Sequence, residues 1–170
     1  MDNIYKINRS IADNIKTVYY DSPTGCLEVQ CTEQGLRAVN FVEKQIIEQN
    51  INIHTTLTIK QLQEYFDGKR TTFDMPLDIE GTAFQQQVWK ALLNIPYGKT
   101  KSYMDIAKAV GNPKTIRAVG LANGQNKIAI IIPCHRVIGS DGSLTGYAGG
   151  LSRKKWLLEF ETPSTQKTLF

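Results

Sequence analysis

The sequence predicts an α+β protein in two parts: a small N-terminal α/β domain with an antiparallel sheet, and a mainly helical C-terminal domain. Three segments rich in β-branched and aromatic residues follow one another in the first part, whereas capped amphipathic helix patterns dominate the second. The charge divides at the same place. Residues 1–80 carry 8 Lys and Arg against 12 Asp and Glu, and residues 81–170 carry 12 against 4. We therefore expect domains over 1–80 and 81–170, the second of which meets a polyanion.

The composition is that of an ordinary globular protein, with 41% hydrophobic and 21% charged residues in a chain of 170. Its longest apolar run, residues 128–132, is too short to cross a bilayer, and no basic-then-apolar leader follows Met1. We expect a monomer without membrane contact, in the cytoplasm or, in a eukaryotic host, in the nucleus. The three cysteines form no C-x-x-C pair, and Cys26, Cys31 and His54 match no standard zinc spacing, so no metal is expected.

The first part is expected to contain three strands, over residues 16–20, 26–32 and 36–42. Turn-forming residues at 22–25 and 33–35 separate them, which favours an antiparallel meander. A helix is then expected to start at Thr58, because Thr58 and Gln61 have capping-box spacing, and to end at Gly68.

The second part opens with another capping box at Thr82 and Gln85, which predicts a helix that Pro96 stops. Ser102 can cap a following helix that ends at Gly111, and Asn112 can cap a third. These two helices form a helix-turn-helix candidate. The second of them carries cations and small side chains that suit a DNA backbone, namely Lys114, Arg117, Ala118, Gly120 and Ala122.

A last helix is expected to be capped by Ser152, with Leu151 and Trp156 as a hydrophobic staple. Its first turn contains Arg153, Lys154 and Lys155, although the helix dipole disfavours cations there. A site that receives a polyanion explains these cations better than solvent screening does.

The chemistry is expected at Cys134. Residues 128–132 are expected to form a buried strand or extended segment that ends at Pro133, immediately before Cys134. A cysteine in this position is usually inert packing. Here, however, His135 and Arg136 follow at once, and nearby cationic or basic groups favour the reactive thiolate.

The segment Pro133-Cys134-His135-Arg136-Val137, followed by residues 146–151 (GYAGGL), closely resembles the O6-alkylguanine-DNA alkyltransferase family. Further matching positions precede it in the right order over residues 82–161, including 95–98 (IPYG), 111–113 (GNP) and 117–120 (RAVG). Residues 1–80 match only in length and strand pattern. The resemblance implies a winged-helix-like helix-turn-helix and repair of alkylated guanine in double-stranded DNA without a cofactor. It leaves activity on O4-methylthymine open.

The resemblance also implies catalytic roles. Cys134 would accept the alkyl group in one irreversible turnover, and His135 would act as base through a bound water. Glu161 would hold and polarise the imidazole, and Asn126 would stiffen the hinge before the nucleophile.

At the DNA, Arg117 would enter the base stack, and Tyr103 would crowd a phosphate and donate to the flipped base. Lys114, Ala118, Ala122 and Arg136 are also expected to contact DNA. The guanine pocket would be lined by Tyr147, Ala148, Lys154 and Val137. Two departures from the family pattern are Lys127, where many members have proline, and Thr115-Ile116, where smaller residues are common.

Plainer structural explanations exist for several of these residues. Tyr103 suits a helix core, Asn126 a turn, Glu161 a solvated chain end and Lys154 an open surface. Other protein classes are also conceivable. A non-enzymatic damage sensor of the same fold would lack Cys134, a papain-like hydrolase would need a second supported histidine, and a related regulator would carry an extra cysteine-rich domain.

Overall fold

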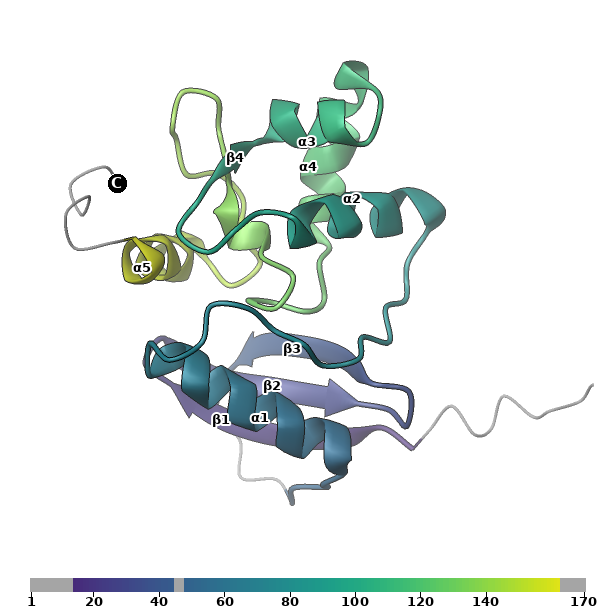
Figure 1. Cartoon of the computed structure of the whole chain (residues 1–170), viewed down its shortest axis with the longest axis vertical. Coiled ribbons are helices and arrows are strands. Elements are labelled where there is room, and N and C mark those ends of the chain that lie inside the picture. Colours follow the sequence, from purple (N-terminus) through teal and green to yellow (C-terminus); the bar gives the residue numbers. More distant parts are fainter. Residues whose placement is uncertain (1–13, 45–47, 163–170) are drawn as a thin grey trace, which may run out of the picture.

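The structure is a computed structural model that describes residues 14–44 and 48–162. Its N-terminal part is a sheet of three antiparallel strands in the order β1-β2-β3, with helix α1 across one face (Figure 1). The strands are β1 (Lys16–Ser22), β2 (Gly25–Cys31) and β3 (Leu36–Val42), and α1 spans Ile53–Phe66. The predicted meander and α+β class are confirmed.

Helix α1 begins earlier than the sequence indicated. Asn52, not Thr58, is its N-cap, and the capping box joins Asn52 to Thr55. Thr58 lies inside the helix, where its hydroxyl donates to the His54 carbonyl at 2.8 Å. A buried threonine can satisfy its hydroxyl within the helix in this way, so its spacing to Gln61 is no sign of a helix start.

The second part is mainly helical, as expected. Thr82 and Gln85 form the predicted capping box of α2 (Ala83–Leu93), and Ser102 caps α3 (Tyr103–Ala109). Asn112 caps the 3₁₀ turn η2 (Pro113–Thr115), which leads into α4 (Ile116–Gly124). The short strands β4 (Lys101–Ser102) and β5 (Val137–Ile138) pair in parallel.

The last helix, α5 (Leu151–Glu161), starts one residue before the expected cap. Gly150 precedes it at a φ of 89°, and no side chain caps its first turn. Ser152 therefore lies within the helix. Glycine adopts such a φ without the steric cost that a Cβ would impose. The backbone conformation of Gly150, rather than a capping side chain, therefore determines where α5 begins.

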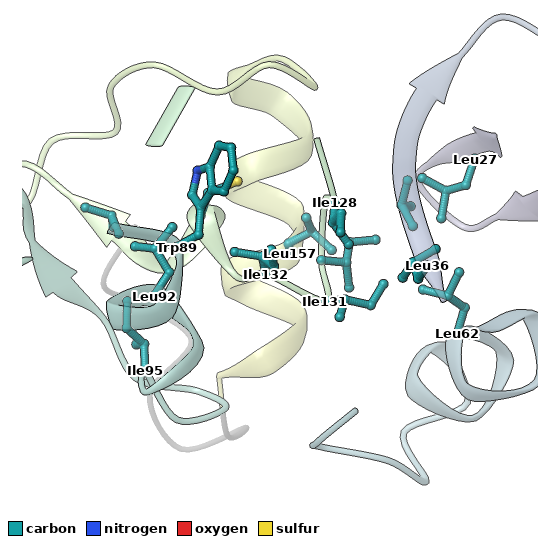
Figure 2. Packing of buried hydrophobic residues seen from close by; sticks show 14 of the residues in the cluster. Leu27, Leu36, Leu62, Trp89, Leu92, Ile95, Ile128, Ile131, Ile132 and Leu157 are labelled. Carbon is teal, nitrogen blue, oxygen red and sulfur yellow. The ribbon is translucent and has the colours of Figure 1, made fainter. Parts of the chain in front are cut away.

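One hydrophobic core joins the two parts. Figure 2 shows Ile128 and Ile131 between Leu36 of the sheet and Leu157 of α5. Backbone bonds reinforce this contact, because the Val39 N–H donates to the Lys127 carbonyl at 2.9 Å and the Ala129 N–H donates to the Val39 carbonyl at 3.0 Å. None of the described helices is long and apolar enough to span a membrane.

Candidate active site

Cys134 follows a tightly turned segment rather than the predicted strand. The Ile131 N–H donates to the Ala129 carbonyl at 2.8 Å across Ile130, whose φ is 71°. A second three-residue turn closes across Pro133, where the Cys134 N–H donates to the Ile132 carbonyl at 2.8 Å. Positive φ is costly for a β-branched residue, so the turn across Ile130 is a rare kind, whereas the turn across Pro133 has the common inverse geometry. The length and hydrophobicity of residues 128–132 predict a strand or extended segment, because neither property reveals a turn of three residues.

The side chain of Asn126 holds this turn together. Its Nδ2 donates to the Ile132 carbonyl at 2.9 Å and approaches the Ile128 carbonyl at 3.3 Å, and its Oδ1 accepts from the Ile128 N–H at 3.0 Å. The same Nδ2 lies 3.1 Å from Cys134 Sγ. Asn126 is buried, so it is more than a surface turn residue. It links the fold of the turn to the position of the sulfur.

The residue Cys134 is 4% exposed and lies at the start of the 3₁₀ turn η3 (Cys134–Arg136). Burial raises the pKa of this thiol, while the Asn126 amide, the charge of Lys154 and nearby backbone N–H groups act against the rise. The resting side chain is therefore a thiol at neutral pH. Reaction at carbon requires that a neighbouring base take its proton.

His135, next to Cys134 in the chain, has one ring nitrogen bonded and the other without a partner among the described residues. The residue is fully buried, and its Nε2 lies 2.8 Å from Glu161 Oε1 at the end of α5. Its other ring nitrogen, Nδ1, is buried with no hydrogen-bond partner among the described residues. Because Glu161 occupies one side of the ring, the opposite nitrogen is left to receive a proton.

Arg136 takes a different position from the expected one at the DNA. Its guanidinium is bidentate to Glu161, with Nε 2.8 Å from Oε2 and Nη2 2.9 Å from Oε1, and Nη1 donates to the Ile95 carbonyl at 2.7 Å. The side chain is buried, so these bonds would have to break before it reached a phosphate. Its expected contact with DNA is therefore corrected, and Arg136 is assigned as a partner of Glu161.

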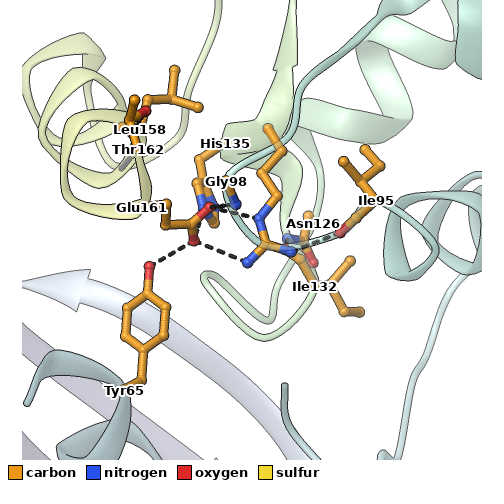
Figure 3. Close-up of polar contacts among 10 residues, drawn as sticks. Tyr65, Ile95, Gly98, Asn126, Ile132, His135, Leu158, Glu161 and Thr162 are labelled. Atoms are coloured by element: carbon orange, nitrogen blue, oxygen red, sulfur yellow. Dashed lines mark hydrogen bonds and ion pairs between the residues drawn. The ribbon is translucent and has the colours of Figure 1, made fainter. Parts of the chain in front are cut away.

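Glu161 is a buried carboxylate rather than a solvated chain end. Burial alone would raise its pKa, but His135 and Arg136 outweigh that effect and hold the pKa well below its usual range. Its further partners are the Tyr65 hydroxyl, 2.7 Å from Oε1, and the Gly98 N–H, 3.5 Å from Oε2 (Figure 3). Tyr65 lies 96 residues away in the chain, so no local sequence pattern signals this contact.

Lys154 is also buried, contrary to a plain surface position. Its Nζ donates to the Val137 carbonyl at 2.5 Å and to the Thr145 carbonyl at 2.9 Å, and lies 5.9 Å from the centre of the Tyr103 ring. Burial lowers the pKa of Lys154 to about 8. The Val137 side chain is packed in the core, so only its carbonyl faces this group.

Residues 145–150 lie between Lys154 and the sheet. The Tyr103 hydroxyl donates to the Thr145 carbonyl at 3.0 Å, and the Tyr147 ring meets Phe41 edge-on at 6.4 Å between centroids. The Tyr147 hydroxyl is buried with no hydrogen-bond partner among the described residues, whereas Ala148 is exposed. Arg153 holds the loop against the sheet, because its guanidinium donates both to the Thr24 carbonyl, between β1 and β2, and to the Gly149 carbonyl of the loop. It is therefore committed to the sheet rather than free to receive a polyanion.

The helix-turn-helix presents the expected cations. Lys114, Arg117 and Ala118 are exposed, and Lys127 is exposed after Asn126. Ala122 is buried instead, and its carbonyl accepts from Trp89 Nε1 at 2.9 Å. The small residue at this position serves packing against α2, which corrects its expected contact with DNA.

Family profiles match both parts of the chain. The DNA-binding domain of 6-O-methylguanine DNA methyltransferase matches residues 83–163. The ribonuclease-like domain of the same enzyme matches residues 15–79.

Relatives and solved structures give the same match. The methylated-DNA–protein-cysteine methyltransferase of Methanosarcina barkeri is 50% identical over 154 residues, which cover 85% of this chain and 97% of the relative. A crystal structure of the Mycobacterium tuberculosis O6-methylguanine methyltransferase has a TM-score of 0.79 at 46% identity, with 88% of this chain and 96% of that chain covered. The structure of Mycobacterium tuberculosis OGT in complex with DNA has a TM-score of 0.78 at 47% identity, with the same coverage.

Proposed function

The chain belongs to the 6-O-methylguanine DNA methyltransferase family, and from that premise we propose that Cys134 accepts the alkyl group in DNA repair. The protein is a methylated-DNA–protein-cysteine methyltransferase that reverses guanine alkylation directly. The observation that carries the assignment of Cys134 is its thiol at 3.1 Å from Asn126, next in the chain to the buried His135–Glu161 pair. Neither Cys26 nor Cys31 has a histidine next to it in the chain.

The alkylated base must leave the duplex before it can meet a buried thiol. Extrusion of a base costs a few kcal/mol, and a side chain that fills the vacated stack offsets part of that cost. Arg117 is the exposed cation of α4 that suits this role, and Lys114 beside it adds attraction for the phosphates. Tyr103, whose hydroxyl is fixed to Thr145, is the residue of α3 that contacts the loop before α5.

The transfer itself uses side chains of this protein and one bound water. His135 Nδ1 takes the thiol proton through a bound water, and the Glu161 carboxylate, which Arg136 holds in place, stabilises the imidazolium that results. Sγ then attacks the alkyl carbon, so an S–C bond forms while the C–O bond to guanine breaks. The leaving oxygen takes the electron pair, the third N–H of the Lys154 ammonium offsets the charge, and the released guanine then takes up one proton from solvent. The product is a thioether, which no neighbouring group can hydrolyse, and each molecule therefore acts once.

A burst experiment tests this function. With excess duplex that contains O6-methylguanine, we expect repaired guanine to appear in an amount equal to the active protein and then to stop. Methyl transfer that continues beyond one equivalent would contradict the mechanism.

A further inference from the structure

The N-terminal part reaches the candidate active site through one buried hydroxyl. Tyr65, in the last turn of α1, donates from its hydroxyl to Glu161 Oε1 at 2.7 Å (Figure 3). The side chain is fully buried. None of the roles assigned above uses it, although it touches the carboxylate that holds His135.

The ring of Tyr65 is locked before any substrate arrives. Four aromatic rings surround it at centroid distances of 5.1 to 6.1 Å, namely Phe66, Phe73, Tyr97 and Phe160. Aromatic packing of this kind leaves the ring little freedom, so the hydroxyl stays directed at Glu161. Burial and the nearby carboxylate raise the pKa of Tyr65 well above its usual value, which keeps it a proton donor.

Tyr65 and His135 share the same oxygen. Glu161 Oε1 accepts from the Tyr65 hydroxyl at 2.7 Å, lies 2.8 Å from His135 Nε2 and accepts from Arg136 Nη2 at 2.9 Å. Each donor withdraws negative charge from that oxygen, so each lowers its pull on the others. A carboxylate without Tyr65 would hold an imidazolium more strongly.

Resting on the proposed roles of Cys134 and His135, we propose that Tyr65 is a positioning residue for alkyl transfer. Its hydroxyl takes part of the charge on Glu161 Oε1, the oxygen that His135 Nε2 also contacts, and so sets how strongly Glu161 holds the imidazole that accepts the thiol proton. The sheet domain thereby takes part in the chemistry rather than only supporting it. The other groups that face Glu161 are Arg136 from η3, Tyr97 and the Gly98 N–H from the segment after α2, and Tyr147 from the loop before α5.

Tyr65→Phe removes the hydroxyl and keeps the ring. Tyr19→Phe is the matched control, because the Tyr19 hydroxyl also donates to a carboxylate, Glu28 at 3.0 Å, but on the sheet away from the site. The measurement is the single-turnover rate constant of methyl transfer at saturating duplex, followed against pH, together with the burst amplitude. Amplitude counts folded active molecules and the rate constant does not depend on their number, so a folding defect is separated from a chemical one.

For Tyr65→Phe we expect the acid limb of the rate profile to move up by about half a unit to one unit of pH. The rate then falls about threefold to tenfold on that limb and meets the wild-type rate at higher pH, with the Tyr19→Phe profile unchanged. Superimposed profiles, or a loss that is equal at every pH, would overturn the role of Tyr65. Wild-type protein that transfers no methyl group would instead refute the proposed function itself.

Discussion

At the scale of single residues, the site depends on one buried carboxylate and the donors around it. Glu161 is 2% exposed and accepts from groups in α1, the segment after α2 and η3. A buried charge is tolerable only when its partners are complete. The sequence identified Glu161 through resemblance, but assigned Arg136 to DNA because a basic residue beside a nucleophile suits either role.

Arg136→Met should destabilise the protein by about 3–5 kcal/mol at neutral pH, because it leaves the Glu161 carboxylate buried without its cation. The pKa of Glu161 is lower in the folded than in the unfolded protein, where it is near 4.5. The stabilisation is therefore complete above that value and is lost as the pH falls below it. Urea unfolding at a series of pH values measures the difference between variant and wild type.

The control for this prediction is Arg37→Met. Arg37 pairs with Asp78 at 2.5 Å, but both side chains are more than a fifth exposed, so we expect a loss of about 0–1 kcal/mol. Equal losses in the two variants would show that Glu161 is not the buried, charged group described above.

At the scale of elements, the sequence located the helix caps at Thr82 and Ser102 but misplaced the cap of α1, and it did not reveal patterns with a tertiary cause. The capping box at Thr82 and the cap at Ser102 require only neighbours three residues away, and the sequence located both. Residues 128–132 resemble a strand because five apolar residues suit one, but a buried amide from Asn126 bends them instead. Ala122 shows the same limit, since α2 covers a small residue that the helix pattern placed toward DNA.

Asn126→Asp tests the role of the turn. The change keeps the shape of the side chain but places a carboxylate oxygen where an amide donates to the Ile132 carbonyl and approaches Cys134 Sγ. Repulsion should raise the pKa of the thiol further and reduce the transfer rate at neutral pH by at least about tenfold. The exposed Asn40 on β3 provides the control variant, Asn40→Asp, which should react at the wild-type rate. A normal rate in Asn126→Asp would remove the link between this turn and the thiol.

Arg117→Ala tests the helix-turn-helix. Its transfer rate should fall on duplex DNA, which requires base extrusion, and much less on the free base O6-methylguanine, which does not. Lys60→Ala removes an exposed cation from α1 and serves as control. Equal losses on the two substrates would make Arg117 a purely structural residue.

At the scale of the whole molecule, the two parts are coupled through the site. The sheet contacts the segment before Cys134 through Val39, holds the loop at Tyr147 through Phe41, and reaches Glu161 by way of α1 and Tyr65. The charge difference between the two halves was visible in the sequence, but these contacts join residues far apart in the chain. A change in volume at Cys134 is therefore expected to affect the stability of the whole protein.

Alkylation should lower the melting temperature. A methyl group added to Cys134, a residue that is only 4% exposed, forces packed neighbours to move, at about 1–3 kcal/mol. Each kcal/mol shifts the melting temperature of a chain this size by about 2–4 °C. Calorimetry of the protein before and after reaction with methylated duplex measures the shift, with Cys134→Ser treated in the same way as control. Equal melting temperatures of alkylated and free protein would mean that there is free space around the thiol and that it is exposed.

The most direct test of the central claim is the site of the methyl group after one turnover. The protein is incubated with excess duplex that contains O6-methylguanine, its intact mass is measured by mass spectrometry, and the modified residue is then located by peptide mapping. The Cys134→Ser variant is treated in the same way as a control. We predict one added methyl group per molecule, on Cys134, and none on the Cys134→Ser variant, because a serine hydroxyl without comparable activation is a far poorer nucleophile. A methyl group on Cys26 or Cys31, or a methylated Cys134→Ser protein, would contradict the account.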